Sequence, residues 1–126
     1  MSKFTTPLKL EFLNYKDFKL LEEFEYYREN DKNEVIKVPA GFVTDFASIP
    51  RLFWSILPPT GTKKNKYAKS AVLHDFCFDR TCQYGYSFNE ANDIFLESMK
   101  AVGVSKIVRY TLYYCVKWFG KSHYKS

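Results

Sequence analysis

Two short stretches of the sequence place ionisable side chains among apolar neighbours. The stretch "SAVLHDFCFDR", residues 70–80, contains the adjacent pair His74 and Asp75. The stretch "GFVTDFASIP", residues 41–50, contains Asp45 in a similar setting. Unpaired charges are costly to bury, so such groups are normally paired, bound to a metal ion or used in chemistry. These three residues are therefore candidates for a functional site.

A further acid, Asp93, lies near the apolar residues Ile94 and Phe95 of the next predicted helix. If the two helices form an antiparallel hairpin, Asp93 can accept a hydrogen bond from His74, which leaves Asp75 for another ligand. A histidine held in one tautomer by a carboxylate is suited to base catalysis, and a second carboxylate can bind a metal ion. The simpler alternatives are a satisfied core histidine and, for Asp93, an acid favoured by the helix dipole.

The first third of the chain is predicted to form a small antiparallel β-sheet. Residues 8–14 alternate apolar and polar side chains, which is typical of a half-buried strand. Residues 16–28 are rich in aromatic side chains and are predicted to pair with residues 34–39 as a hairpin. Leu20, Leu21 and Phe24 also fit a helix face, which is the alternative for that segment.

The rest of the chain is predicted to be helical, which gives an α+β protein. A short helix is expected from Ile49 and Pro50, with Ser48 as its N-cap. Longer helices are predicted over residues 66–80, 87–103 and 105–120. The second of them begins with a capping box, Ser87 with Glu90. The third is expected to bury one stripe of residues: Ile107, Val108, Leu112, Cys115, Val116 and Phe119. We predict a single domain over residues 1–126, mainly β in 1–47 and mainly α in 48–126.

The composition is that of a folded protein. Apolar residues make up 46% and aromatic residues 19% of the 126 residues, which argues against disorder. There is no apolar run long enough for a transmembrane segment, and the N-terminus lacks the layout of a secretory signal. The three cysteines are predicted to be reduced core thiols: Cys77, Cys82 and Cys115.

The net charge of +5 is unevenly spread along the chain. Residues 1–50 hold 7 Lys/Arg and 9 Asp/Glu, a net −2, whereas residues 51–126 hold 12 and 5, a net +7. A basic half can bind nucleic acid, anionic lipid or an acidic protein, and it can equally be a solvated face. Aromatic residues of the third helix are predicted to serve packing or an interface, with nucleic-acid stacking as the alternative: Tyr110, Tyr113, Tyr114, Trp118 and Phe119.

The motifs "HDFCF" and "ANDIFLESM" resemble the secreted phospholipases A2, especially their bacterial members. The resemblance implies that His74 activates water, that Asp93 orients His74, and that Asp75 and Asp45 bind calcium. Zinc and manganese are alternatives, since both accept histidine and carboxylate ligands. Phe46 and Ala47 follow Asp45 where the calcium loop of that family is rich in glycine.

A longer set of motifs resembles a family of small proteins of unknown function from tailed bacteriophages and prophages. It consists of "VPAGFVTDFASIPRLFW", then "AVLHDF", then a helix with Asp and Met before "GV". This resemblance implies a phage or prophage origin, and a location in the host cytoplasm or the virion.

Together these observations lead us to expect a phage-encoded, metal-dependent hydrolase acting on an ester or phosphoester. His74 and Asp93 are the expected catalytic residues, and Asp45 and Asp75 the expected metal ligands. Two further residues are expected to contact the substrate: Ser48 and Arg51. Their alternative roles are an N-cap for Ser48 and a solvated or locally paired side chain for Arg51. The alternative function is a non-enzymatic protein that binds a virion component or host factor, with the His/Asp cluster as a structural network.

Overall fold

The computed structural model describes residues 3–6, 8–13, 17–28, 34–44, 68–79 and 84–119, together with Cys82 and Tyr124. Its strands are β1 (Lys3–Phe4), β2 (Leu10–Phe12), β3 (Phe18–Leu20), β4 (Phe24–Tyr27), β5 (Val35–Val38) and β6 (Val43–Thr44). Its helices are α1 (Ala68–Phe78), α2 (Phe88–Ala101) and α3 (Lys106–Phe119). The predicted α+β class is therefore confirmed. The short helix predicted at Ile49 and Pro50 lies outside the described residues.

The strands form two antiparallel sheets, with the orders β1-β4-β5 and β2-β3-β6. β4 and β5 pair from Phe24 opposite Val38 to Tyr27 opposite Val35, which confirms the predicted hairpin. Its inward-facing side chains are fully buried: Phe24, Tyr26, Ile36 and Val38. The alternation of buried and more exposed positions is what a sheet with one face on the core requires.

The segment 16–28, predicted as one strand, instead contains two strands that belong to different sheets. β3 ends at Leu20 and β4 begins at Phe24. Buried side chains occupy even-numbered positions on both strands, and this alternation would carry Glu22 inward. Because burying an unpaired carboxylate is costly, the chain leaves the sheet there. Glu22 instead forms an exposed ion pair with Lys9, at 3.2 Å.

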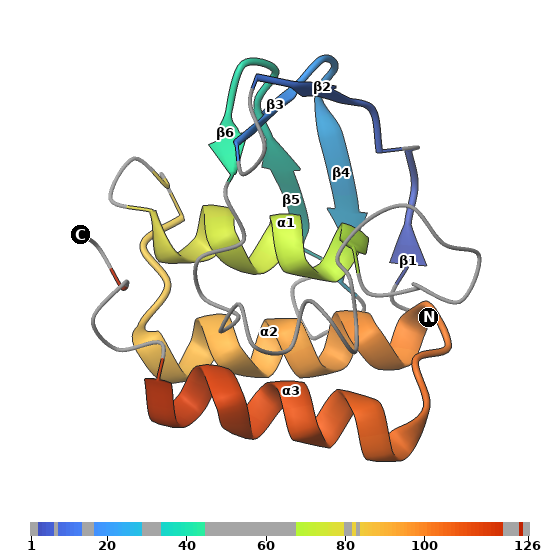
Figure 1. Cartoon of the computed structure of the whole chain (residues 1–126), viewed down its shortest axis with the longest axis vertical. Helices are drawn as coiled ribbons and strands as arrows, with labels where there is room; N and C mark the ends of the chain where they lie inside the picture. Colours follow the sequence, from blue (N-terminus) through green and yellow to red (C-terminus); the bar gives the residue numbers. More distant parts are fainter. Residues whose placement is uncertain are drawn as a thin grey trace.

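The three helices lie in successive layers on one side of the strands (Figure 1). α1 lies between the strands and α2, and α3 packs against the opposite side of α2. Consecutive helices run in opposite directions. Because α1 is covered on two sides, its described side chains are buried, except for the half-buried Lys69 and Asp75. None of the helices in the described ranges has the length and apolar character that a membrane crossing needs.

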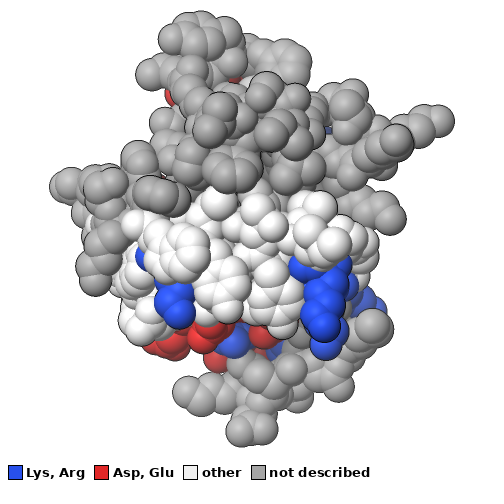
Figure 2. Space-filling view, turned by 60° about the horizontal axis from the view of Figure 1, so that its bottom comes forward, with Lys and Arg blue, Asp and Glu red and all other residues white. Residues whose placement is uncertain are grey.

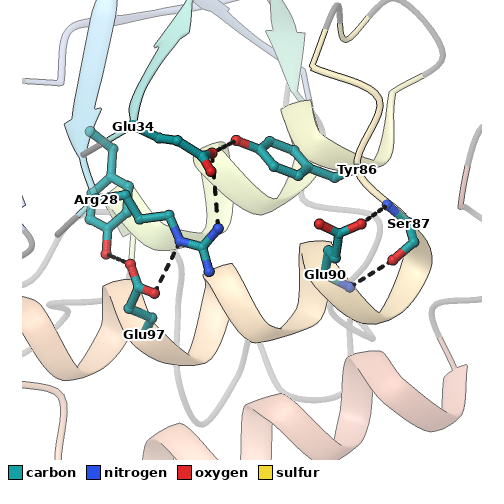
Figure 3. A network of polar contacts seen from close by, with 7 residues as sticks. Arg28, Glu34, Tyr86, Ser87, Glu90 and Glu97 are labelled. Atoms are coloured by element: carbon teal, nitrogen blue, oxygen red, sulfur yellow. Dashed lines mark hydrogen bonds and ion pairs between the residues drawn. The ribbon is translucent and has the colours of Figure 1, made fainter. Parts of the chain in front are cut away.

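The predicted start of α2 is confirmed. Ser87 is the N-cap, and its hydroxyl accepts a hydrogen bond from the backbone N–H of Glu90 at 3.1 Å (Figure 3). In return, the Glu90 carboxylate accepts one from the backbone N–H of Ser87 at 3.2 Å. Beyond the other end, Gly103 has a φ of +84°, a left-handed conformation that favours glycine and ends the helix.

One residue of the apolar stripe predicted for α3 was assigned to the wrong face. The buried residues of α3 are Leu112, Cys115 and Val116, with Val108 half-buried. Ile107, expected among them, is 82% exposed. At about 100° per residue, Ile107 and Val116 lie on opposite sides of the helix, so both cannot face α2. The side chain of Phe119 lies outside the described set.

A polar network joins the β1-β4-β5 sheet to α2 (Figure 3). Arg28, which follows β4, donates from Nε to Glu97 on α2 at 3.1 Å and lies 4.0 Å from Glu34. The Tyr26 hydroxyl also donates to Glu97, at 2.7 Å. The Tyr86 hydroxyl donates to Glu34 at 2.7 Å, and burial together with the Glu34 carboxylate raises the pKa of Tyr86. Tyr86 therefore stays protonated and keeps this hydrogen bond at neutral pH.

Candidate functional site

His74 is fully buried on α1, where its imidazole packs against two aromatic rings. The ring centroids lie 4.1 Å from Phe78, one turn along α1, and 4.6 Å from Phe95 on α2. Burial lowers the pKa of His74 to about 4, because the imidazolium ion loses its hydration there. The imidazole is therefore neutral at pH 7.

The side chain that orients His74 is Asn92 on α2. The Nε2 atom of His74 lies 2.8 Å from the Oδ1 atom of Asn92. An amide oxygen can only accept, so Nε2 carries the proton and donates, and the basic lone pair is on Nδ1. Asn92 thus selects one tautomer as a carboxylate would. Its neutral amide adds no charge to stabilise an imidazolium ion.

The predicted hydrogen bond between Asp93 and His74 is not formed, so the orienting role assigned to Asp93 was wrong. Asp93 is exposed, and its carboxylate accepts a hydrogen bond from the Tyr113 hydroxyl of α3 at 3.2 Å. Neighbouring residues of a helix point about 100° apart, so the two positions 92 and 93 cannot both face α1. Burial and the Asp93 carboxylate together raise the pKa of Tyr113.

Asp75 lies half-buried at the edge of the site, where α1 meets β6. The hydroxyl of Thr44, the last residue of β6, donates a hydrogen bond to Asp75 Oδ2. Thr44 directly precedes Asp45 in the sequence, so this contact joins α1 to the strand that leads into Asp45. Asp45 itself, with the predicted substrate residues Ser48 and Arg51, lies outside the described residues.

The described side chains do not by themselves make a metal centre. Within the described ranges, no group of three His, Cys, Asp or Glu side chains is placed to hold an ion. Among the described residues, Asp75 supplies one carboxylate at the edge of the site, whereas Ca²⁺ takes about six to eight oxygen ligands. A cation bound here would need further ligands from the segment after Thr44, where Asp45 is the predicted one.

Two buried polar atoms near His74 have no hydrogen-bond partner within the described structure: Ser70 Oγ and Asn92 Nδ2. Ser70 lies one helical turn before His74, and Asn92 contacts His74 directly. Buried polar atoms nearly always have a partner in the protein or an ordered water. Ser70 Oγ can donate or accept a hydrogen bond and Asn92 Nδ2 can donate one, so an ordered water molecule is a suitable partner for either atom.

The sequence analysis missed Asn92 and Thr44 as site residues. A signal for Asn92 exists, because Asn92, Phe95 and Met99 follow the three- and four-residue spacing of a buried helix face. Asp93 falls outside that spacing. No local pattern points to Thr44, whose partner Asp75 is 31 positions away in the sequence.

Comparison with known proteins gives a family for this chain but no activity. No curated protein and no solved structure matches it. Residues 18–116 match a family model described as "Protein of unknown function (DUF1353)". The match covers well over half of the chain and includes Thr44, His74, Asp75 and Asn92. The chain therefore belongs to the DUF1353 family, whose function is unknown.

Proposed function

We propose that this chain is a hydrolase in which His74 activates a water molecule for attack on an ester or phosphoester. The observation that carries the proposal is the contact between His74 Nε2 and Asn92 Oδ1, which makes Nδ1 the basic nitrogen. Nδ1 would accept a proton from water while the water oxygen bonds to the ester carbon or phosphorus. The imidazolium would then return that proton to the leaving alkoxide, so that protons balance over the reaction.

Asp75 and Asp45 are the residues that would hold a divalent cation in this proposal. Calcium fits oxygen ligands best, and zinc or manganese are the alternatives. When bound, such an ion would stabilise the negative charge that develops on the substrate oxygen. Support comes from the contact between Thr44 and Asp75, because Thr44 leads directly into Asp45. Ser48 and Arg51 are the proposed contacts to the substrate.

A phage or prophage origin is part of the same proposal. It is supported by the motifs "GFVTDFASIPR" and "LHDF", which resemble those of proteins from tailed phages. The protein would then act in the host cytoplasm or as a component of the virion.

The complete burial of His74 favours a second candidate function. A substrate must be able to reach the base that acts on it, whereas His74 is fully buried in contact with Phe78 and Phe95. In this candidate, His74, Asn92 and Asp75 are internal structural contacts, and the protein acts by binding a virion component or a host factor.

A metal titration with matched variants tests the hydrolase proposal. The melting temperatures of the wild type, Asp75→Asn and Asp93→Asn would be measured with calcium, zinc and manganese. An ion at about 100 times its dissociation constant stabilises the fold by about 2.7 kcal/mol. We expect one ion to stabilise the wild type and Asp93→Asn, but not Asp75→Asn. Asp93→Asn is the control because it removes the same charge from an exposed position that does not contact His74.

Activity is then measured on a panel of carboxylic and phosphoric esters with the wild type, Asp75→Asn and His74→Gln. Glutamine is preferred to alanine because His74 is fully buried and alanine would leave a cavity. A hydrolysis rate that both variants lower at least about 100-fold supports the proposal, since a general base contributes about 10²–10⁴-fold. No stabilisation by any ion together with no hydrolysis would reject it in favour of the binding protein.

A further inference from the structure

The outer face of α3 carries large apolar and aromatic side chains that the hydrolase proposal does not use. Ile107 is 82% exposed and Trp118 is 69% exposed, with Tyr110 and Tyr114 also exposed between them. These four residues recur at intervals of three and four, so they form one stripe along the helix. We call this stripe the α3 face. The α3 face lies on the side of α3 that points away from α2. Leu112 and Val116, on the opposite side of the helix, are buried.

The rings of the α3 face pack against one another along the helix. The ring centroids of Tyr110 and Tyr114 are 6.5 Å apart, and those of Tyr114 and Trp118 are 5.4 Å apart. The rings of each pair are tilted by only 31°. They therefore form a continuous apolar ridge and leave little room for a nucleic-acid base to stack between them.

Basic residues accompany the ridge, and α3 contains no acidic residue. The Lys117 ammonium lies 5.9 Å from the ring centroids of Tyr113 and Tyr114, and the Arg109 guanidinium lies 5.7 Å from that of Tyr110. Lys106 is exposed at the start of the helix. Figure 2 shows uncharged surface between two groups of Lys and Arg side chains on this side of the molecule, with Asp and Glu side chains below it.

We propose that the α3 face binds the surface of an anionic lipid membrane. A helix with Trp and apolar residues on one side and cations beside them is suited to lie in the plane of a membrane interface. Tyr and Trp prefer that boundary because their rings are apolar and their polar tips can stay hydrated. Lysine and arginine side chains can keep their charges at anionic headgroups while their stems cover apolar surface.

The charge and shape of the face favour lipid over the other occupants. A second copy of the chain would bring two basic helices together, and like charges oppose that contact. A folded protein partner would need a matching groove for a protruding row of rings. A lipid surface, by contrast, deforms around such a row. Binding through α3 does not involve His74, so a failure of the hydrolase proposal would not affect this inference.

Sedimentation with lipid vesicles tests the inference. The vesicles would contain phosphatidylcholine alone or with about 30 mol% phosphatidylglycerol as the anionic lipid. We expect binding to the anionic vesicles at low salt, a steep loss of binding as salt is raised, and little binding to the neutral vesicles. His74→Gln should bind as the wild type does.

Two pairs of matched variants locate the surface. The double variant Lys106→Gln and Lys117→Gln should weaken binding roughly 30-fold, at about fivefold for each cation. Its control, Lys19→Gln with Lys37→Gln, removes two exposed lysines from strands β3 and β5. Trp118→Ser should weaken binding roughly tenfold, because a large apolar side chain is no longer buried. Its control is Leu21→Ser, at an exposed leucine among the strands.

The outcomes separate the alternatives. Binding that the α3 variants reduce and the control variants leave unchanged supports the inference. Absence of binding to anionic vesicles at low salt would overturn it, as would equal losses in the α3 and control variants. Binding to a single-stranded oligonucleotide but not to vesicles would assign the surface to nucleic acid instead. Self-association that Trp118→Ser abolishes, seen by analytical ultracentrifugation without vesicle binding, would assign it to a second copy of the chain.

Discussion

At the scale of single residues, the main feature is that His74 is an uncharged, buried imidazole in contact with Asn92. Its pKa is lowered from the ordinary value of 6.5 to about 4, chiefly by burial. Between these two values the unfolded chain binds a proton that the folded chain does not. The free energy of unfolding therefore falls as the pH falls from 6.5 to 4.

The size of this pH effect can be predicted. A shift from 6.5 to about 4 corresponds to about 3 kcal/mol of stability, which is present above pH 6.5 and lost by pH 4. Urea unfolding of the wild type and of His74→Gln would be measured across this range with a chelator present. We expect the wild type to lose about 3 kcal/mol more than the variant, because glutamine does not titrate. Parallel pH profiles would show that His74 has an ordinary pKa.

Asn92 provides a second prediction at this scale. Asn92→Asp places a carboxylate 2.8 Å from His74 Nε2 in place of the neutral amide oxygen. A negative charge at that distance stabilises the imidazolium ion, so the pKa of His74 should rise by at least about one unit. The titration is followed by NMR of the imidazole. Asp93→Asn serves as the control and should leave the titration unchanged, because Asp93 contacts Tyr113 rather than His74.

At the scale of elements, the start of α2 is set by its capping box. Ser87→Ala removes the side-chain acceptor for the Glu90 backbone N–H, and should lower the free energy of unfolding by about 1 kcal/mol. Chemical unfolding measures this change directly. Asn89→Ala is a suitable control, because Asn89 is exposed in the first turn and does not cap the helix. A loss for Asn89→Ala equal to that for Ser87→Ala would show that the cap is not responsible.

The sequence predicted those elements whose determinants are local. The boundaries of α2 follow from Ser87, Glu90 and Gly103, and the pairing of β4 with β5 follows from alternating side chains near a turn. The split of segment 16–28 was not predicted, although the alternation of β3 and β4 would place Glu22 inward; the sheet that each part then joins depends on the neighbouring strands. The exposure of Ile107 was not predicted either. Apolar residues of α3 occur on more than one side of the helix, so the sequence pattern does not decide which side α2 covers.

The candidate site could be predicted only in part for a related reason. The sequence indicates that His74 and Asp75 lie among core residues, and the structure places both on α1. Whether Asn92 or Asp93 faces His74 depends on the rotation of α2 about its axis, which tertiary packing fixes. The contact between Thr44 and Asp75 joins segments that are distant in the sequence.

At the scale of the whole molecule, the network of Arg28, Glu34, Glu97 and two tyrosines links the sheet to the helices. The side chain of Arg28 is 19% exposed, whereas that of Lys9 in the Lys9–Glu22 pair is 51% exposed. Arg28→Met should therefore cost about 2 kcal/mol of stability, because it leaves half-buried carboxylates without their cation. Lys9→Met should cost less than about 1 kcal/mol, as is usual for a surface pair. Equal losses in chemical unfolding would mean that the network is no stronger than a surface pair.

The most direct test of this account is the titration of the His74 imidazole by long-range ¹H–¹⁵N NMR, between pH 3 and pH 8 with a chelator present. Both the proposed hydrolase chemistry and the alternative structural role rest on a neutral ring with its proton on Nε2. We predict that His74 stays neutral in that tautomer down to about pH 5 and titrates near pH 4. A titration near pH 6.5, or a proton on Nδ1, would contradict the burial of His74 and its contact with Asn92.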